Sequence, residues 1–204
     1  STFTFLSKDV QIGVSDILFQ SPVKAVRHAN GRDWWIYMLL RGSNQYQLIL
    51  LDPSGINFMG LLDSGINMPQ ALGLATISPS GKYMAVGVAV LNSNDQHVFI
   101  YEIDRCSGSL AFRDSFSLVT QLWPGFGFSS NEKYLYTSSE SRYLWQFDIE
   151  ASDIGASRVL VGEYDGFVHG SNSPTTFGPI MQTPDGRPYV VPTTPSNEHL
   201  HLIQ

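Results

Sequence analysis

Histidines are the residues of this sequence best suited to metal or proton chemistry. The two nearest one another are His199 and His201, which on a β-strand would lie on one face, as two metal ligands would. The nearest third ligand, Glu198, would point to the opposite face, so the pair alone predicts no metal site. The other histidines are His28, His97 and His169.

A second candidate for proton chemistry is a loop-like stretch that runs to Pro179. Within it, Asp165 and His169 are spaced as an acid/base pair. No serine or cysteine nucleophile accompanies the pair, so a polar surface position is the favoured interpretation of both residues.

No catalytic or cofactor motif is complete in this chain. The segment Gly127–Asn131 lacks the closing glycine of a nucleophile elbow, and Gly125–Gly127 is not followed by a helix start. The turn-like segment Asn92–Asp95 lacks the glycine and distal glutamate of a calcium loop. Cys106 has no neighbouring base and cannot form an internal disulfide, because it is the single cysteine. We therefore expect no catalytic residue, no metal and no cofactor.

Aromatic side chains make up 12% of the sequence and suit either packing or carbohydrate stacking. Strand alternation places Trp34 and Trp35 on opposite faces, so both can be buried only between two neighbouring sheets. We favour this core interpretation over an exposed platform for a sugar ring, also for Trp123 and Trp145.

Composition excludes several classes of protein. Only 15% of the residues are charged and the net charge is −6, with no basic cluster, so a nucleic-acid binder is not expected. No apolar run approaches the roughly 18 residues of a membrane helix. The start, Ser1–Leu6, has no signal-peptide pattern, and the final residues, His199–Gln204, have the pattern of a strand. We expect the chain to be a piece of a longer protein.

A recurring sequence motif, called here the repeat phrase, is the most informative feature of the sequence. A serine, threonine or other small polar residue is followed by a turn, then a basic residue, then an aromatic residue. The basic residue recurs as Arg32, Lys82, Lys133 and Arg187, at intervals of 50, 51 and 54 residues. Period-two alternation follows the phrase, most clearly in a hairpin over 134–149. The chain is therefore predicted to be all-β and built of repeated antiparallel units.

The repeat favours a β-propeller, since a four-stranded unit buries its faces only by packing on neighbouring units. We expect one domain or propeller fragment over residues 1–204, with about four blades. A β-sandwich explains the alternation but not the constant interval. The predicted units span 22–62, 73–118, 124–163 and 177–204. Residues 1–19, through Thr2–Leu6 or Ile17–Phe19, are one option for closing the last blade; a larger propeller or a ring completed by a second copy are the others.

The order of strands within each unit predicts which residues line the central axis of the propeller. The expected inner strands are Ala75–Ile77, Gly127–Phe128 and Ile180–Met181, and the expected outer strands are Leu110–Leu118 and Ser157–Val161. An enzyme of propeller type would place several Asp, Glu or His residues near one opening of the axis. The inner strands here supply mainly small and apolar residues, which favours a scaffold.

The repeat phrases Leu74–Ala85 and Val98–Asp104 resemble the WD-like or YVTN-type propeller repeat of bacterial proteins. The phrases around Trp34, Tyr134 and Tyr189 are more specifically similar to large secreted surface proteins of Bacteroidetes. The resemblance covers about residues 23–204. It implies an exported or cell-surface protein with a binding or scaffolding role, and it carries no catalytic residues.

These observations predict a non-enzymatic module that binds a protein or a carbohydrate at the cell surface. Self-association into a homodimer through open blade edges is a further expectation. The alternative is a lactonase-like hydrolase with a metal or an acid/base cluster at the central channel.

Overall fold

The computed structural model is all-β in the residues that it describes. These are residues 18–40, 42–67, 71–90, 95–119, 125–139, 142–170, 173–183, 186–194 and 198–203. Their one helical element is a single 3-10 turn, Gly155–Ser157. The predicted fold class is confirmed.

Antiparallel sheets, here called blades 1 to 4, follow one another along the chain, each with its strands in sequence order. Blade 1 consists of β1 (Leu18–Arg27), β2 (Trp34–Leu40), β3 (Gln45–Asp52) and β4 (Gly55–Asp63). Blade 2 consists of β5 (Ala71–Ile77), β6 (Tyr83–Val90), β7 (Asp95–Ile103) and β8 (Leu110–Val119). Blade 3 consists of β9 (Phe126–Phe128), β10 (Tyr134–Ser139), β11 (Tyr143–Asp148) and β12 (Val159–Glu163). Blade 4 consists of β15 (Phe177–Gln182), β16 (Pro188–Pro192) and β17 (His201–Leu202).

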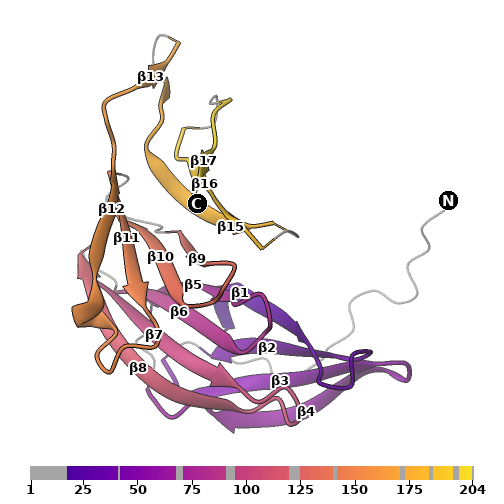
Figure 1. Cartoon of the computed structure of the whole chain (residues 1–204). Coiled ribbons are helices and arrows are strands. Elements are labelled where there is room, and N and C mark those ends of the chain that lie inside the picture. The colour runs from indigo at the N-terminus through magenta and orange to yellow at the C-terminus, as the bar shows by residue number, and fades with distance from the viewer. Residues whose placement is uncertain are drawn as a thin grey trace, which may run out of the picture.

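The blades lie side by side along an open arc, with blade 1 at one end and blade 4 at the other (Figure 1). The first strands β1, β5, β9 and β15 are consecutive neighbours on the inside of the arc. A short hairpin of β13 (Val168–His169) and β14 (Ser173–Pro174) extends from the arc between blades 3 and 4. This is the blade arrangement of a propeller, and the expected inner strands occupy the positions predicted for them.

Apolar side chains fill the spaces between adjacent blades. A single four-stranded layer cannot bury its own faces, so each blade depends on this packing. Trp35 and Tyr37 of blade 1 pack with Met84 and Tyr101 of blade 2. The next spaces hold similar clusters, centred on Phe128 between blades 2 and 3 and on Phe177 and Val190 between blades 3 and 4. Burial between blades is therefore the dominant stabilisation.

The structure contradicts one of the options for ring closure, in which Ile17–Phe19 would complete the last blade. Leu18 lies in β1 opposite Leu40 of β2, so this part of the segment belongs to blade 1 and not to the last blade. Ser1–Ile17 lie outside the described residues. Blade 4 has three strands within the part of the chain that the structure describes.

The repeat phrase forms the same turn in all blades. In each turn a backbone N–H donates to a carbonyl five residues ahead, or four in blade 4, and the amide three residues along donates back. The paired residues are His28 and Asp33, Ser78 and Tyr83, Ser129 and Tyr134, and Thr183 and Arg187. The turn needs a left-handed residue, which is Gly31, Gly81 and Gly186 in three blades, with φ of 75°, 77° and 79°. This shared geometry explains the periodicity of the sequence.

Blade 3 departs from this pattern, because Glu132 takes the left-handed position with φ of 61°. Its carboxylate accepts hydrogen bonds from the backbone N–H and the hydroxyl of Ser80, in the equivalent turn of blade 2. The strained residue therefore links two blades.

The Glu132→Ala variant is expected to be less stable than Glu132→Gly by about 1 kcal/mol. Both variants lose the link to Ser80, but only glycine relieves the left-handed strain. Urea denaturation of both proteins measures the difference, and Glu150→Ala, an exposed glutamate of the same blade, is the control. Equal stability of the two variants would show that the φ value at residue 132 carries no strain.

Candidate functional site

The structure brings His199 next to a histidine of a distant segment. His199 Nε2 lies 3.0 Å from His169 Nδ1, although thirty residues separate them. His201 instead donates from Nε2 to the carbonyl oxygen of Thr175, at 2.8 Å. Two imidazoles from different segments, the β13–β14 hairpin and the segment before β17, are thus brought together.

The loop that carries His169 is ordered by hydrogen bonds around Phe167. The carbonyl oxygen of Phe167 accepts from the Tyr164 hydroxyl (2.8 Å) and from the backbone N–H of Thr175 (3.1 Å). The backbone N–H of Phe167 donates to Asp165 Oδ1 at 2.9 Å. The Asp165 carboxylate therefore closes a local turn, and His169 is paired with His199 rather than with this carboxylate.

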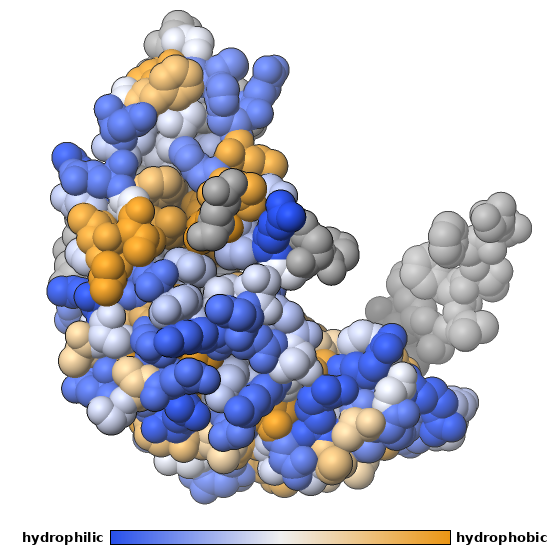
Figure 2. Space-filling view, viewed as in Figure 1, coloured by the Kyte–Doolittle hydropathy of each residue, from blue (hydrophilic) through white to orange (hydrophobic). Residues whose placement is uncertain are grey.

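These segments enclose a hollow of about 240 Å³, called here the aromatic hollow. Its lining consists of Glu163, Tyr164, Asp165, Phe167, Thr175, Phe177, His199, Leu200 and His201. The Phe167 ring is 49% exposed and meets the His199 ring edge to face, with centroids 5.4 Å apart. Figure 2 shows apolar surface over β12 and near the β13–β14 hairpin. The hollow combines an exposed aromatic ring with imidazole and carboxylate groups.

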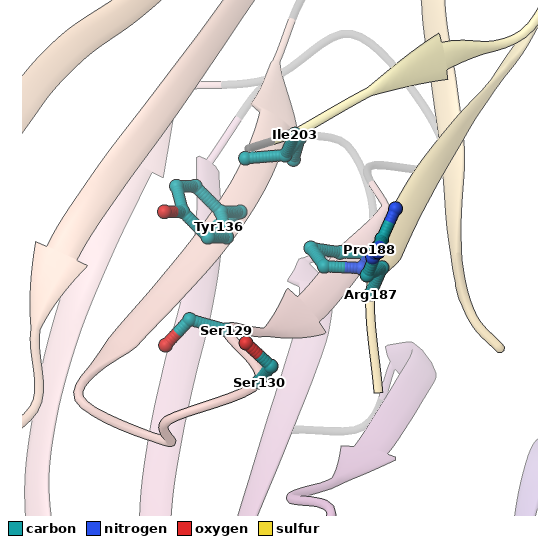
Figure 3. A pocket seen from close by; sticks show the side chains of 6 residues that line it. All are labelled: Ser129, Ser130, Tyr136, Arg187, Pro188 and Ile203. Atoms are coloured by element: carbon teal, nitrogen blue, oxygen red, sulfur yellow. The ribbon is translucent and has the colours of Figure 1, made fainter. Parts of the chain in front are cut away.

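A second hollow, of about 350 Å³, lies between blades 3 and 4 (Figure 3). It is lined by Ser129, Ser130, Tyr136, Arg187, Pro188 and Ile203. Burial, and then the neighbouring Tyr134, raises the pKa of Tyr136, so its hydroxyl stays protonated. Ser129 already stabilises its own turn, since its hydroxyl donates to Asn131 (2.6 Å) and accepts from the Tyr134 N–H (2.9 Å). The polar side chains of this second hollow are those of Ser129, Ser130, Tyr136 and Arg187, and its described lining contains no exposed phenylalanine ring.

The inner strands contribute apolar groups in the described part of the chain. Ala75, Phe126 and Phe128 are buried, and Ile180 is half-buried. The described residues contain no group of three His, Cys, Asp or Glu side chains that could hold a metal ion. Nor do they contain a helix long and apolar enough to cross a membrane.

The remaining candidates have local structural roles. His28 Nδ1 accepts from the Asn30 N–H at 3.0 Å, and His97 is bonded to the Ser117 hydroxyl at 3.1 Å. Cys106 is exposed. Trp123 and the loop 91–94 lie outside the described residues.

The tryptophan prediction is confirmed in the alternation but only partly in the burial. Trp35 is 4% exposed and packs between blades 1 and 2. Trp34, on the other face of β2, is 37% exposed, because none of the described strands forms a blade on that side of blade 1.

The pair of His169 and His199 has no sequence signal. Their separation of thirty residues matches no ligand spacing, and the contact depends on where the β13–β14 hairpin lies relative to β17.

Comparisons with known proteins identify the fold. No family model matches the chain, and no curated protein does. The β-propeller domain of Cps50 (Swd1) from Myceliophteria thermophila is similar, with 13% identity and a TM-score of 0.51 over 83% of this chain and 49% of that chain. The periplasmic gluconolactonase of Pseudomonas aeruginosa has 14% identity and a TM-score of 0.44, over 88% of this chain and 52% of that chain.

The chain spans about half the length of these two solved structures. At such low identity, the likeness to the Cps50 domain concerns the fold alone. The chain has the architecture of a β-propeller.

Proposed function

We propose that this chain is a non-enzymatic propeller module that binds a glycan through the aromatic hollow, with a protein ligand as the alternative occupant. The observation that carries the proposal is the exposed ring of Phe167 beside imidazole and carboxylate groups. An exposed aromatic face stacks on the apolar face of a sugar ring. Carboxylates such as Glu163 and Asp165 accept hydrogen bonds from sugar hydroxyls.

The walls of the hollow support a preformed binding site. Three donors and acceptors around Phe167 fix its backbone, and His201 ties β17 to Thr175. Glu163 is held by Arg142 at 3.0 Å. A preorganised site loses little conformational entropy when a ligand binds.

The competing function is a lactonase-like hydrolase. Such an enzyme would require acid/base or metal-ligating groups that converge at the axis. The described inner-strand residues are mainly apolar there, which supports binding over catalysis. A lactone-hydrolysis assay with the purified chain discriminates between the two, since turnover would favour the hydrolase.

Phe167→Ala is expected to reduce glycan binding by at least about tenfold, because the stacking face is lost. A glycan array identifies a ligand for the unmodified chain, and calorimetry compares the variants. Phe112→Ala removes a similarly exposed ring (40%) from β8 and serves as the matched control. Unchanged binding by Phe167→Ala would exclude the aromatic hollow as the glycan site, and capture of a protein through the same residue would favour the alternative occupant.

The resemblance of the repeat phrases to secreted surface proteins supports an exported location. We propose that the parent protein is displayed at the cell surface. Protection of a tagged full-length protein from protease added to intact cells would contradict this proposal.

The two ends of the arc support self-association. Val23, Ile56 and Phe58 of blade 1 are 60%, 54% and 43% exposed, and Met181 and Leu202 of blade 4 are 61% and 38% exposed. We propose that a second copy covers these residues, because the apolar faces that adjacent blades turn toward each other are buried. Sedimentation equilibrium measures the mass, and a monomer at all concentrations would contradict the proposal.

A further inference from the structure

We propose that His169 and His199 bind a transition-metal ion of the Zn²⁺, Ni²⁺ or Cu²⁺ class on the wall of the aromatic hollow. The ligating atoms are His169 Nδ1 and His199 Nε2. The site lies at the end of the arc beside blade 4, and it does not involve the inner strands.

The separation of the two nitrogens matches that of two ligands on one ion. His169 Nδ1 and His199 Nε2 are 3.0 Å apart, and the ring centroids are 4.9 Å apart with a 68° angle between the planes. Two zinc–nitrogen bonds of about 2.0–2.1 Å at a tetrahedral angle hold their nitrogens roughly 3.3 Å apart. An ion bound to both nitrogens would widen their separation by a few tenths of an ångström, and each imidazole ring would reorient so that its lone pair points at the ion.

The surrounding contacts hold both imidazoles in place. The edge-to-face contact with Phe167 supports the ring of His199. His169 lies in β13, which pairs with β14 through Ser173. His201 anchors the neighbouring β17 to Thr175, so the two ligand-bearing segments are fixed relative to each other. Such support is what separates a binding site from two mobile surface histidines.

The chemistry of the donors selects the class of ion. Imidazole nitrogen suits Zn²⁺, Ni²⁺ and Cu²⁺, whereas Mg²⁺ and Ca²⁺ require oxygen ligands. The described residues supply no third ligand for a closed site, so water or an oxygen atom of a ligand in the hollow would complete the coordination. The carboxylate of Asp165, which lines the same hollow, adds negative potential that favours a cation.

Metal binding by this pair does not depend on the proposed function, whereas a role of the ion in recognition does. The two are measured separately. The direct readout is metal bound to the ligand-free chain, and glycan binding with and without the ion is a second experiment.

The test is calorimetric titration of the untagged chain with ZnCl₂ at neutral pH, with Cu²⁺ electron paramagnetic resonance as the second measurement. We expect one ion per chain and nitrogen hyperfine couplings in the Cu²⁺ spectrum. His199→Ala and His169→Ala should each weaken binding by at least about tenfold, because one of two ligands is lost. His97→Ala and His28→Ala remove histidines elsewhere and should leave the affinity unchanged.

Two results would overturn the assignment. One is the absence of saturable metal binding by the unmodified chain, and the other is an unchanged metal affinity in both His169→Ala and His199→Ala. Thermal unfolding is recorded for every variant, and His199→Gln, which keeps a polar side chain of similar length, separates loss of the ligand from loss of local structure. Weakened binding in a His199→Gln protein with an unchanged unfolding midpoint supports the site.

Discussion

Replacing Gly125 by alanine is expected to lower the free energy of unfolding by about 3 kcal/mol. A Cβ atom at this position would lie 2.3 Å from the backbone nitrogen of Ile180 and 2.6 Å from the carbonyl oxygen of Gly178. Both are main-chain atoms of β15 and cannot rotate away, so blade 4 would have to move away from blade 3.

The same position is joined to blade 4 by hydrogen bonds through Ser138. The Ser138 hydroxyl accepts from the Gly125 N–H at 2.7 Å and donates to the Gly178 carbonyl at 2.8 Å. Ser138 is only 1% exposed, so a displaced blade 4 would leave buried polar groups without partners. Steric overlap and lost hydrogen bonds therefore act in the same direction.

Urea denaturation measures the stability of Gly125→Ala, and hydrogen exchange of the β15 amides locates the damage. The matched control is Gly162→Ala in β12, where the nearest atoms to a new Cβ lie 3.3 and 3.4 Å away, in the side chains of Leu144 and Phe177. We expect a loss of 1 kcal/mol or less for the control, on the order of a typical surface change. Similar losses in the two variants would show that blades 3 and 4 are not packed as described.

The turns and strands of this fold could be predicted from the sequence, because contacts between residues close in the chain determine them. The turns recur because Gly31, Gly81, Glu132 and Gly186 adopt a left-handed conformation at intervals of 50, 51 and 54 residues. Alternating residues such as Tyr143 and Phe147 then specify strands on either side. The hairpin over 134–149 and the inner strands followed from these local rules.

The part that sequence could not predict depends on how distant elements meet. His169 and His199 come together only because the β13–β14 hairpin and blade 4 place them so, and no spacing rule encodes that contact. Glu132 is a similar case, since a non-glycine residue in a left-handed position is explained only by Ser80 of the neighbouring blade. The candidate site was missed because its residues interact across blades and loops.

The adjacent tryptophans Trp34 and Trp35 provide the second test of packing between blades. Trp35→Ala is expected to destabilise the protein by about 4 kcal/mol, because a large buried side chain is removed. Trp35 also donates from Nε1 to the carbonyl oxygen of Arg105 (2.9 Å), and the Arg105 guanidinium donates to the carbonyl oxygen of Arg27 in blade 1 (2.8 Å). Loss of the indole therefore removes packing and one end of a link between blades 1 and 2.

Trp34→Ala should cost only about 1 kcal/mol, although the residue is next in sequence and identical in type. Trp34 is 37% exposed, and the Arg27 guanidinium lies over its ring, 5.3 Å from the ring centroid. Thermal and urea unfolding of the two variants give the comparison. Because strand propensity and composition change equally in both, a difference of about 3 kcal/mol would measure the burial between blades 1 and 2, and equal losses would mean that another surface covers Trp34 in solution.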